Sequence, residues 1–175
     1  MKSLIVYSST DGHTKKICEV IKNNFKHKEN INVISLKKAF EINIDEFDQI
    51  IIGASIRYGK HSSNIYKFIN INKDTLEKRK SAFFSVNVVA RKPAKNTPQT
   101  NPYIIKFLRK TSWKPNKIGV FAGRIDYPNL NFLNRNIIRL IMFLTNGPTD
   151  TKNTYEFTNW QSVERFAKEF DELEV

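Results

Sequence analysis

The feature that most constrains the fold is an alternation of short apolar runs with longer segments of helical spacing. The strongest run, Gln49–Ala54, is apolar and β-branched at successive positions. Such a run is typical of a central parallel strand, because helices cover both of its faces. The alternation predicts an α/β fold with a doubly wound, five-stranded parallel sheet.

The same pattern places the individual elements. We expect strands at Ser3–Tyr7, Val33–Leu36, Gln49–Ala54, Ser81–Val89 and Lys117–Ala122. We expect helices at Thr14–Phe25, Ser63–Ile71 and Tyr103–Arg109, with a last helix capped by Thr158 and Gln161 and buried through Val163, Phe166, Ala167 and Phe170. The lone cysteine, Cys18, lies among apolar neighbours and is expected to be buried. The length suits a single domain spanning residues 1–175.

An unusually long connection precedes the last helix. It covers residues 123–157, which is longer than an ordinary loop. A helix is expected from Phe132 to Leu144, with an apolar line on one side and with Arg135 and Arg139 one turn apart on another. This helix could pack on the sheet, which the pattern favours, or lie in a membrane interface.

Positive charge is concentrated in the middle of the chain. The net charge is +12, and residues 91–153 hold 12 Lys and Arg against two acids, Asp126 and Asp150. The other residues are almost neutral, with 17 basic and 15 acidic side chains. A basic segment of this kind predicts an anionic partner, such as an acidic membrane, a polycarboxylate or a nucleic acid.

Several classes of protein lack support in the sequence. No Walker-type phosphate motif, GxGxxG or GxSxG occurs. The three histidines, His13, His27 and His61, have no metal-ligand spacing, so we predict no metal site and expect them on the surface or in loops. No apolar run reaches the roughly 20 residues that cross a bilayer, and we expect a cytoplasmic protein.

The segment after the first strand carries the clearest chemistry. It reads Ser8-Ser9-Thr10-Asp11-Gly12-His13-Thr14 and leads into a helix. Hydroxyls, a glycine and a helix N-terminus together provide the donors that bind a phosphate. An ordinary N-capped turn would explain one or two of these hydroxyls, but it explains four less well.

Three further strings make the chain resemble a known family. They are GASIRYG at Gly53–Gly59, SVNVVARKPAKNTPQTN at Ser85–Asn101 and TDT at Thr149–Thr151. Together with the first loop, they resemble the flavodoxin-like bacterial protoporphyrinogen oxidases, also called menaquinone-dependent protoporphyrinogen IX dehydrogenases. The chain departs from electron-carrier flavodoxins at Asp11, whose carboxylate would have to cap the following helix, and from the oxidases at Pro148.

The resemblance implies a flavodoxin-like fold that binds FMN between three loops. The implied cofactor residues are Ser9, Thr10, Asp11, Gly12, His13, Thr14, Ser55, Ile56, Arg57, Tyr58, Gly59, Phe84, Ser85, Val86, Asn87, Val88, Val89 and Ala90. Placed with its phosphate in the first loop, the ring would lie between the other two loops, where Tyr58 could stack on it and Asn87 and backbone groups could bond its polar edge; without the first loop, Tyr58 would be read as a surface aromatic beside a turn. No side chain is assigned as catalytic, because the cofactor carries the redox chemistry.

The resemblance also implies the reaction. Protoporphyrinogen IX would lose hydride to the flavin in successive two-electron steps, and a membrane quinone, menaquinone or ubiquinone, would accept the electrons. The substrate carries propionates and the quinone lies in the bilayer, which matches the basic segment. Candidate contacts to propionates or lipid are Arg91, Lys92, Arg124, Tyr127, Arg135 and Arg139. We therefore expect peripheral attachment to the cytoplasmic face of the inner membrane.

Other functions remain open from the sequence. A flavodoxin-type NAD(P)H:quinone reductase would need the same loops, and a low-potential electron carrier is a weaker possibility. A basic module for nucleic acid would lose affinity steeply with salt, but specific nucleic-acid binding is not expected. The oligomeric state is not predicted.

Overall fold

The computed structural model describes residues 1–174 and has a five-stranded parallel sheet at its centre. The strands of this sheet are β1 (Ser3–Ser8), β2 (Ile31–Ser35), β3 (Gln49–Ser55), β4 (Lys80–Val86) and β5 (Lys117–Phe121). Their order across the sheet is β2-β1-β3-β4-β5, and every neighbouring pair is parallel. The chain therefore reverses its direction of travel across the sheet at β1, and such switch points hold ligands in open α/β sheets.

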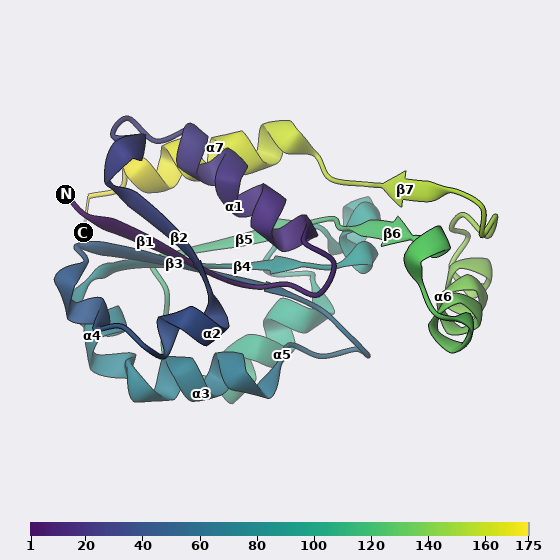
Figure 1. Cartoon of the computed structure of the whole chain (residues 1–175), viewed down its shortest axis with the longest axis horizontal. Helices are drawn as coiled ribbons and strands as arrows, with labels where there is room; N and C mark the ends of the chain where they lie inside the picture. The colour runs from purple at the N-terminus through teal and green to yellow at the C-terminus, as the bar shows by residue number, and fades with distance from the viewer. Residues whose placement is uncertain (175) are drawn as a thin grey trace.

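Helices cover both faces of this sheet (Figure 1). The α-helices are α1 (His13–Asn23), α2 (Leu36–Ala39), α3 (Ser63–Ile71), α4 (Lys73–Lys78), α5 (Pro102–Lys110), α6 (Phe132–Leu144) and α7 (Trp160–Asp171). Helices α1 and α7 lie on one face, and α2, α3, α4 and α5 lie on the other. Short 3-10 turns occur at Lys28–Asn30, Ile44–Glu46, Val88–Arg91, Pro93–Lys95 and Tyr127–Asn129.

Alternation along the strands divides the core into two clusters. In β1, Leu4 and Val6 pack towards the α3 side, whereas Ile5 packs towards α1 and α7. In β3, Gly53 is required because a Cβ there would lie 2.1 Å from the Phe84 ring. The buried face of α7 is the predicted one, and Cys18 is buried as predicted.

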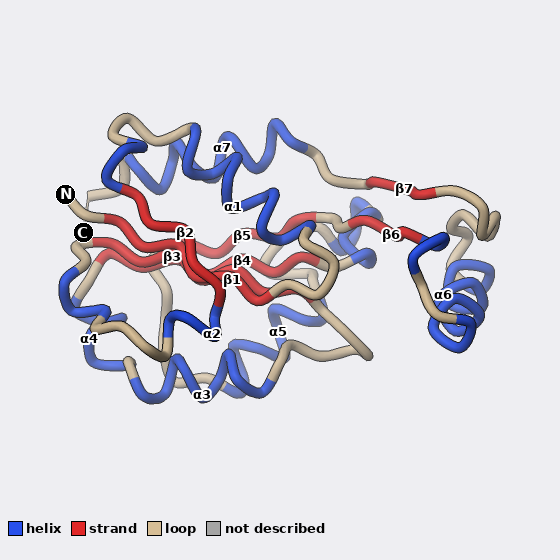
Figure 2. The backbone as a smooth tube through the Cα atoms, viewed as in Figure 1, coloured by secondary structure: helices blue, strands red, loops and turns tan. Residues whose placement is uncertain are grey.

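The insertion forms a separate layer beyond the sheet. It contains β6 (Arg124–Asp126) and β7 (Thr154–Glu156), which pair as an antiparallel ribbon, and α6 lies between them in the chain. In Figures 1 and 2 this ribbon extends from the sheet, and α6 lies at the end of the molecule away from both termini. A small apolar cluster of Ile125, Tyr127 and Met142 joins the ribbon to the helix.

Three sequence-based expectations need correction. The strand predicted at Ser81–Val89 ends at Val86, because the Asn87 side chain accepts the Ala90 N–H and begins a 3-10 turn. The N-cap of α7 is Asn159 rather than Thr158. Finally, α6 does not pack on the sheet, since Met142 is its one buried residue.

Candidate functional site

The candidate site lies at the carboxyl edge of the sheet, beside the switch point at β1. Three connections reach this edge: Ser9–Gly12 after β1, Ile56–Ser62 after β3 and Asn87–Asn101 after β4. The predicted cofactor residues lie on these connections and on the strand ends and helix starts beside them. Parallel strands present their carboxyl ends on the same side, so three segments far apart in the sequence share one edge.

The loop after β1 adopts a left-handed turn before the helix. Gly12 has φ of 81°, a conformation that glycine adopts without strain. Its N–H donates to Ser9 Oγ at 3.0 Å, and the His13 N–H donates to Asp11 Oδ1 at 3.1 Å. The Asp11 carboxylate therefore does cap the start of α1.

Thr14 supplies the test of whether this loop fits a phosphate. Its side chain is fully buried at the first turn of α1, yet its Oγ1 has no hydrogen-bond partner. A buried hydroxyl without a partner costs about 1–3 kcal/mol, and a bound ligand would offset that cost. The hydroxyl lies where the N-terminal field of α1 favours an anion. The residues present therefore fit a phosphate group.

The insertion ribbon is attached to this loop by several polar contacts. Arg124 of β6 donates through Nη2 to the Asp11 carbonyl at 3.3 Å, while its Nε is buried without a partner. Lys16 of α1 lies 3.4 Å from Glu156 of β7. His13 Nε2 lies 2.7 Å from Thr158 Oγ1. The ribbon and the candidate phosphate loop thus form one connected structure.

Two histidines are buried at the site. His13 begins α1, so the expectation of a surface or loop position is wrong for it, whereas His61 lies in the loop after β3 as expected but is buried there. Burial lowers the pKa of His13, although the nearby Glu156 carboxylate acts in the opposite direction. Burial also lowers the pKa of His61 to about 4. His61 packs edge-on against Phe83 and Phe107, and its Nε2 lies 2.9 Å from Ser85 Oγ. Both rings are neutral at physiological pH.

The connection after β3 presents an aromatic ring to solvent. Tyr58 has φ of 48° and is 70% exposed. Its hydroxyl donates to Asn134 Oδ1 of α6 at 3.3 Å, and the Arg57 guanidinium lies 5.2 Å from its ring centroid. Ser55 Oγ donates to the Ser8 carbonyl at 3.3 Å, joining this connection to the loop after β1. Ile56 is half-buried and Gly59 has φ of 71°.

The connection after β4 is built around Asn87, whose side chain is buried. Asn87 Oδ1 accepts hydrogen bonds from the Ala90 N–H at 3.0 Å and from Asn101 Nδ2 at 3.1 Å. Its Nδ2 donates to Ser85 Oγ at 3.2 Å. The Asn87 side chain thus forms hydrogen bonds that shape the loop. Phe84, Ser85, Val86 and Ala90 are buried, whereas Val88 and Val89 are half-buried.

Most of the basic residues expected to meet propionates or lipid have structural partners instead. Arg91 donates to the Thr145 carbonyl and hydroxyl, which ties the loop after β4 to the end of α6. Arg135 donates to the carbonyls of Tyr127, Pro128 and Leu130. Lys92 is half-buried and Arg139 is exposed.

Tyr127 also differs from its expected role. Its ring is 0% exposed, and its hydroxyl donates to the Pro148 carbonyl at 2.8 Å. It therefore forms the core of the insertion rather than a contact surface. The acceptor is the backbone carbonyl of Pro148, which any residue at this position would supply.

Helix α6 exposes a large apolar surface. Its exposed apolar side chains are Phe132, Leu133, Ile137, Leu140, Ile141, Phe143 and Leu144. Phe132, the most exposed of them, is 81% accessible to solvent. A contiguous exposed apolar surface of this kind marks an interaction site. None of the helices in residues 1–174 is long and apolar enough to cross a membrane.

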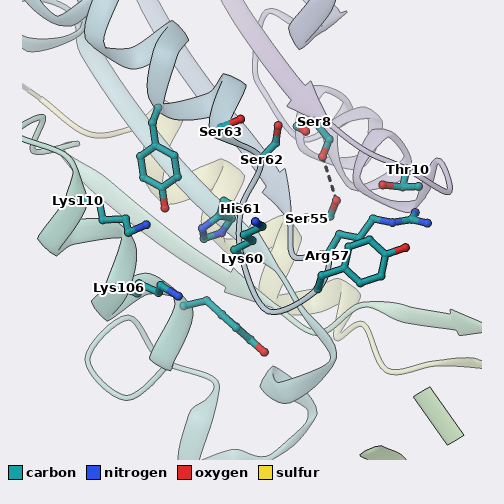
Figure 3. Close-up of a pocket in the computed structure, with 13 residues that line it drawn as sticks. Ser8, Thr10, Ser55, Arg57, Lys60, His61, Ser62, Ser63, Lys106 and Lys110 are labelled. Atoms are coloured by element: carbon teal, nitrogen blue, oxygen red, sulfur yellow. Dashed lines mark hydrogen bonds between the residues drawn. The ribbon is translucent and has the colours of Figure 1, made fainter. Parts of the chain in front are cut away.

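A cavity of about 540 Å³ opens at the same edge of the sheet, between α3 and α5 (Figure 3). Its lining comprises Ser8, Thr10, Ser55, Arg57, Tyr58, Lys60, His61, Ser62, Ser63, Tyr66, Tyr103, Lys106 and Lys110. The residues on its Ser8–Tyr58 side are among those predicted from the sequence, whereas the residues that α3 and α5 contribute are not. The spacing of Lys106 and Lys110, which places both on one face of a helix, was the available signal. Among residues 1–174, no cluster of His, Cys, Asp and Glu could hold a metal ion.

Comparisons with known proteins agree with this architecture. The sequence profile of the family described as "Flavodoxin domain" matches residues 4–152. "Protoporphyrinogen IX dehydrogenase [quinone]" of Escherichia coli K12 is 39% identical over 174 residues, covering 99% of this chain and 96% of that protein. The protein of the same name from Leishmania major is 40% identical over 174 residues, covering 98% of this chain and 75% of its own length.

Solved structures show the same fold at low sequence identity. Oxidised flavodoxin 2 of Bacillus cereus has a TM-score of 0.55 and 16% identity, with 97% of each chain covered. Flavodoxin 1 of the same organism has a TM-score of 0.54, with 99% of this chain and 100% of the other covered. The chain belongs to the flavodoxin domain family and, within it, to the family whose curated members are named protoporphyrinogen IX dehydrogenase [quinone]. That membership indicates a flavin cofactor.

Proposed function

We propose that the chain binds FMN, oxidises protoporphyrinogen IX to protoporphyrin IX in haem biosynthesis, and passes the electrons to a membrane quinone. The match to relatives named for this reaction carries the proposal. It covers 99% of the chain at 39% identity, so it includes the insertion as well as the flavodoxin frame. A similarity restricted to the frame would support only a flavin protein.

The phosphate loop supports FMN as the particular flavin. Thr14 Oγ1, the left-handed turn at Gly12 and the N-terminus of α1 form a site for one terminal phosphate. We assign Ser9, Thr10 and Thr14 to that phosphate, and Tyr58 with the backbone of residues 87–90 to the ring. The flavin, when bound, supplies the redox chemistry, and the side chains only bind it and exclude water.

The insertion supports electron transfer at a membrane surface. Quinones with long tails lie in the bilayer, and α6 presents its apolar side chains to solvent at the end of the molecule away from the termini. Such a helix can lie in the membrane interface without spanning the bilayer. We infer peripheral attachment through α6 at the cytoplasmic face of the inner membrane, with Arg139 near the lipid head groups.

An anaerobic absorbance experiment on the FMN-loaded protein tests the reaction. Protoporphyrinogen IX is added first and a soluble quinone analogue second, while porphyrin fluorescence is followed. We expect the flavin absorbance to bleach as porphyrin appears, and to recover when the quinone is added. Flavin that stays oxidised with protoporphyrinogen but is bleached by NAD(P)H would contradict the proposal and favour an NAD(P)H:quinone reductase.

A further inference from the structure

The cavity between α3 and α5 has a strongly cationic lining. Arg57, Lys60, Lys106 and Lys110 contribute to its wall, and no carboxylate does within residues 1–174. None of these four residues forms an ion pair with another described residue, in contrast to Lys16 and Lys117, which do. Unpaired cations around a concave surface create a site for an anion.

The cavity is polarised along its length. In Figure 3, Ser8 and Thr10 lie at one side, Lys106 and Lys110 lie at the other, and Lys60 and His61 lie between them. The first side is the loop assigned above to the flavin. The second side belongs to α5, where Lys106 and Lys110 are one helical turn apart. A molecule in the cavity could therefore approach the flavin with one part and the lysines with another.

The cationic side also contains aromatic surface. Tyr66 and Tyr103 line it, and Lys110 Nζ lies 5.7 Å from the Tyr66 ring centroid. Burial raises the pKa of Tyr66 and of Tyr103, so both hydroxyls remain protonated donors. The neutral His61 at the inner wall adds no charge. Aromatic walls with cations at the rim suit a flat apolar molecule that carries carboxylates at its edge.

We propose that this cavity binds the porphyrinogen and that Lys60, Lys106 and Lys110 hold its propionate carboxylates, with the macrocycle directed to the flavin side. This inference rests on the proposed function and assigns its substrate site. The three lysines take the place of Arg91 and Arg135 as candidate propionate contacts, because the guanidinium groups of these arginines donate to backbone carbonyls.

The test compares substrates with and without carboxylates. The FMN-loaded double variant Lys106→Glu/Lys110→Glu is compared with wild type for binding of protoporphyrin IX and of its dimethyl ester, by fluorescence in the same detergent. Arg109→Glu is the control on the same helix, because it reverses one positive charge of α5 at a residue that does not line the cavity. We expect the double variant to lose about tenfold or more in affinity for the free acid. Its affinity for the ester should change less than twofold.

Three results would overturn the assignment of the site. They are equal losses for acid and ester, no loss in the double variant, or an equal loss in Arg109→Glu. A parallel loss of FMN affinity would also overturn it, because the cavity would then belong to the cofactor. Binding is measured without turnover, so a wild type that binds the acid through these lysines but fails to oxidise protoporphyrinogen refutes the proposed function and leaves the site intact.

Discussion

The two parts of the insertion, the β6–β7 ribbon and helix α6, differ in their contacts with the rest of the molecule. The β6–β7 ribbon and the adjoining Thr158 contact the candidate phosphate loop and the start of α1 through Arg124, Glu156 and Thr158. Helix α6 instead buries one residue and exposes seven large apolar side chains. One continuous segment therefore includes polar contacts to the candidate phosphate loop and an exposed apolar surface. We therefore expect substitutions in the ribbon to change FMN affinity without changing membrane binding, and substitutions in α6 to do the reverse.

The largest effect is expected on membrane binding. Leu140→Glu/Phe143→Glu removes two exposed apolar side chains from α6, each worth about 1.5–3 kcal/mol when buried. Affinity for anionic vesicles should fall about 100-fold or more. Flotation measures it, and FMN affinity serves as the control. Unchanged vesicle binding would remove the membrane role from this helix.

The next largest effect is the pH dependence of stability, and it arises from His61 in the flavodoxin-like domain outside the insertion. The folded pKa of His61, about 4, lies below the ordinary value of 6.5 because burial disfavours the charged ring. The unfolded chain therefore binds the proton more readily, and stability is lost as pH falls from about 6.5 towards 4. The loss should approach about 3 kcal/mol. Urea unfolding of wild type and His61→Asn should show a smaller loss in the variant, and parallel curves would contradict this account.

Alanine variants of two arginines, Arg124 in the ribbon and Arg139 in α6, test whether the ribbon and the helix have different roles. Arg124→Ala removes the contact to the Asp11 carbonyl and a buried Nε that has no partner, so FMN affinity should fall about tenfold. Arg139→Ala, on the exposed side of α6, should leave FMN affinity unchanged and weaken vesicle binding slightly. Fluorescence titration with FMN measures the first effect. Equal FMN losses in both variants would mean that the ribbon and α6 act as one unit.

The smallest effect sharpens the role of the phosphate loop. Thr14→Val removes a buried hydroxyl without a partner, so the FMN-free protein should be equally stable or more stable. FMN affinity should nevertheless fall several-fold, because the hydroxyl is assigned to the phosphate. Thermal unfolding with and without FMN measures both quantities. A variant that loses stability in both states would show that Thr14 has only a packing role.

Much of the frame was predictable because local pattern and tertiary burial agree there. Gln49–Ala54 was predicted as a strand, and β3 spans Gln49–Ser55, since its β-branched residues are buried on both faces. The predicted end of β4 at Val89 is wrong. Val88 and Val89 favour a strand, but the buried Asn87 side chain starts a 3-10 turn before them. Both Thr158 and Asn159 can cap a helix; in the structure Asn159 accepts the Ser162 N–H, while the Thr158 hydroxyl contacts His13 and the Ala122 carbonyl.

The site was only partly predictable, for a different reason. The phosphate loop is contiguous, so its hydroxyls and glycine were visible together. The cationic cavity joins Lys60 of one connection to Lys106 and Lys110 of α5, and only the fold brings them together. Burial of His61 and Tyr127 also follows from tertiary packing, which short-range spacing does not report. The composition showed an excess of positive charge, but it did not show which arginines are engaged in hydrogen bonds within the protein, as Arg91 and Arg135 are.

Reoxidation of the reduced protein tests the central claim most directly. FMN-loaded wild type and Leu140→Glu/Phe143→Glu are reduced with protoporphyrinogen IX and then mixed either with a long-chain quinone in anionic vesicles or with a soluble short-chain analogue. We expect the variant to match wild type with the soluble quinone and to be at least about tenfold slower with the vesicles. Equal rates with vesicles, or equal slowing with both quinones, would contradict the division of labour between the ribbon and α6.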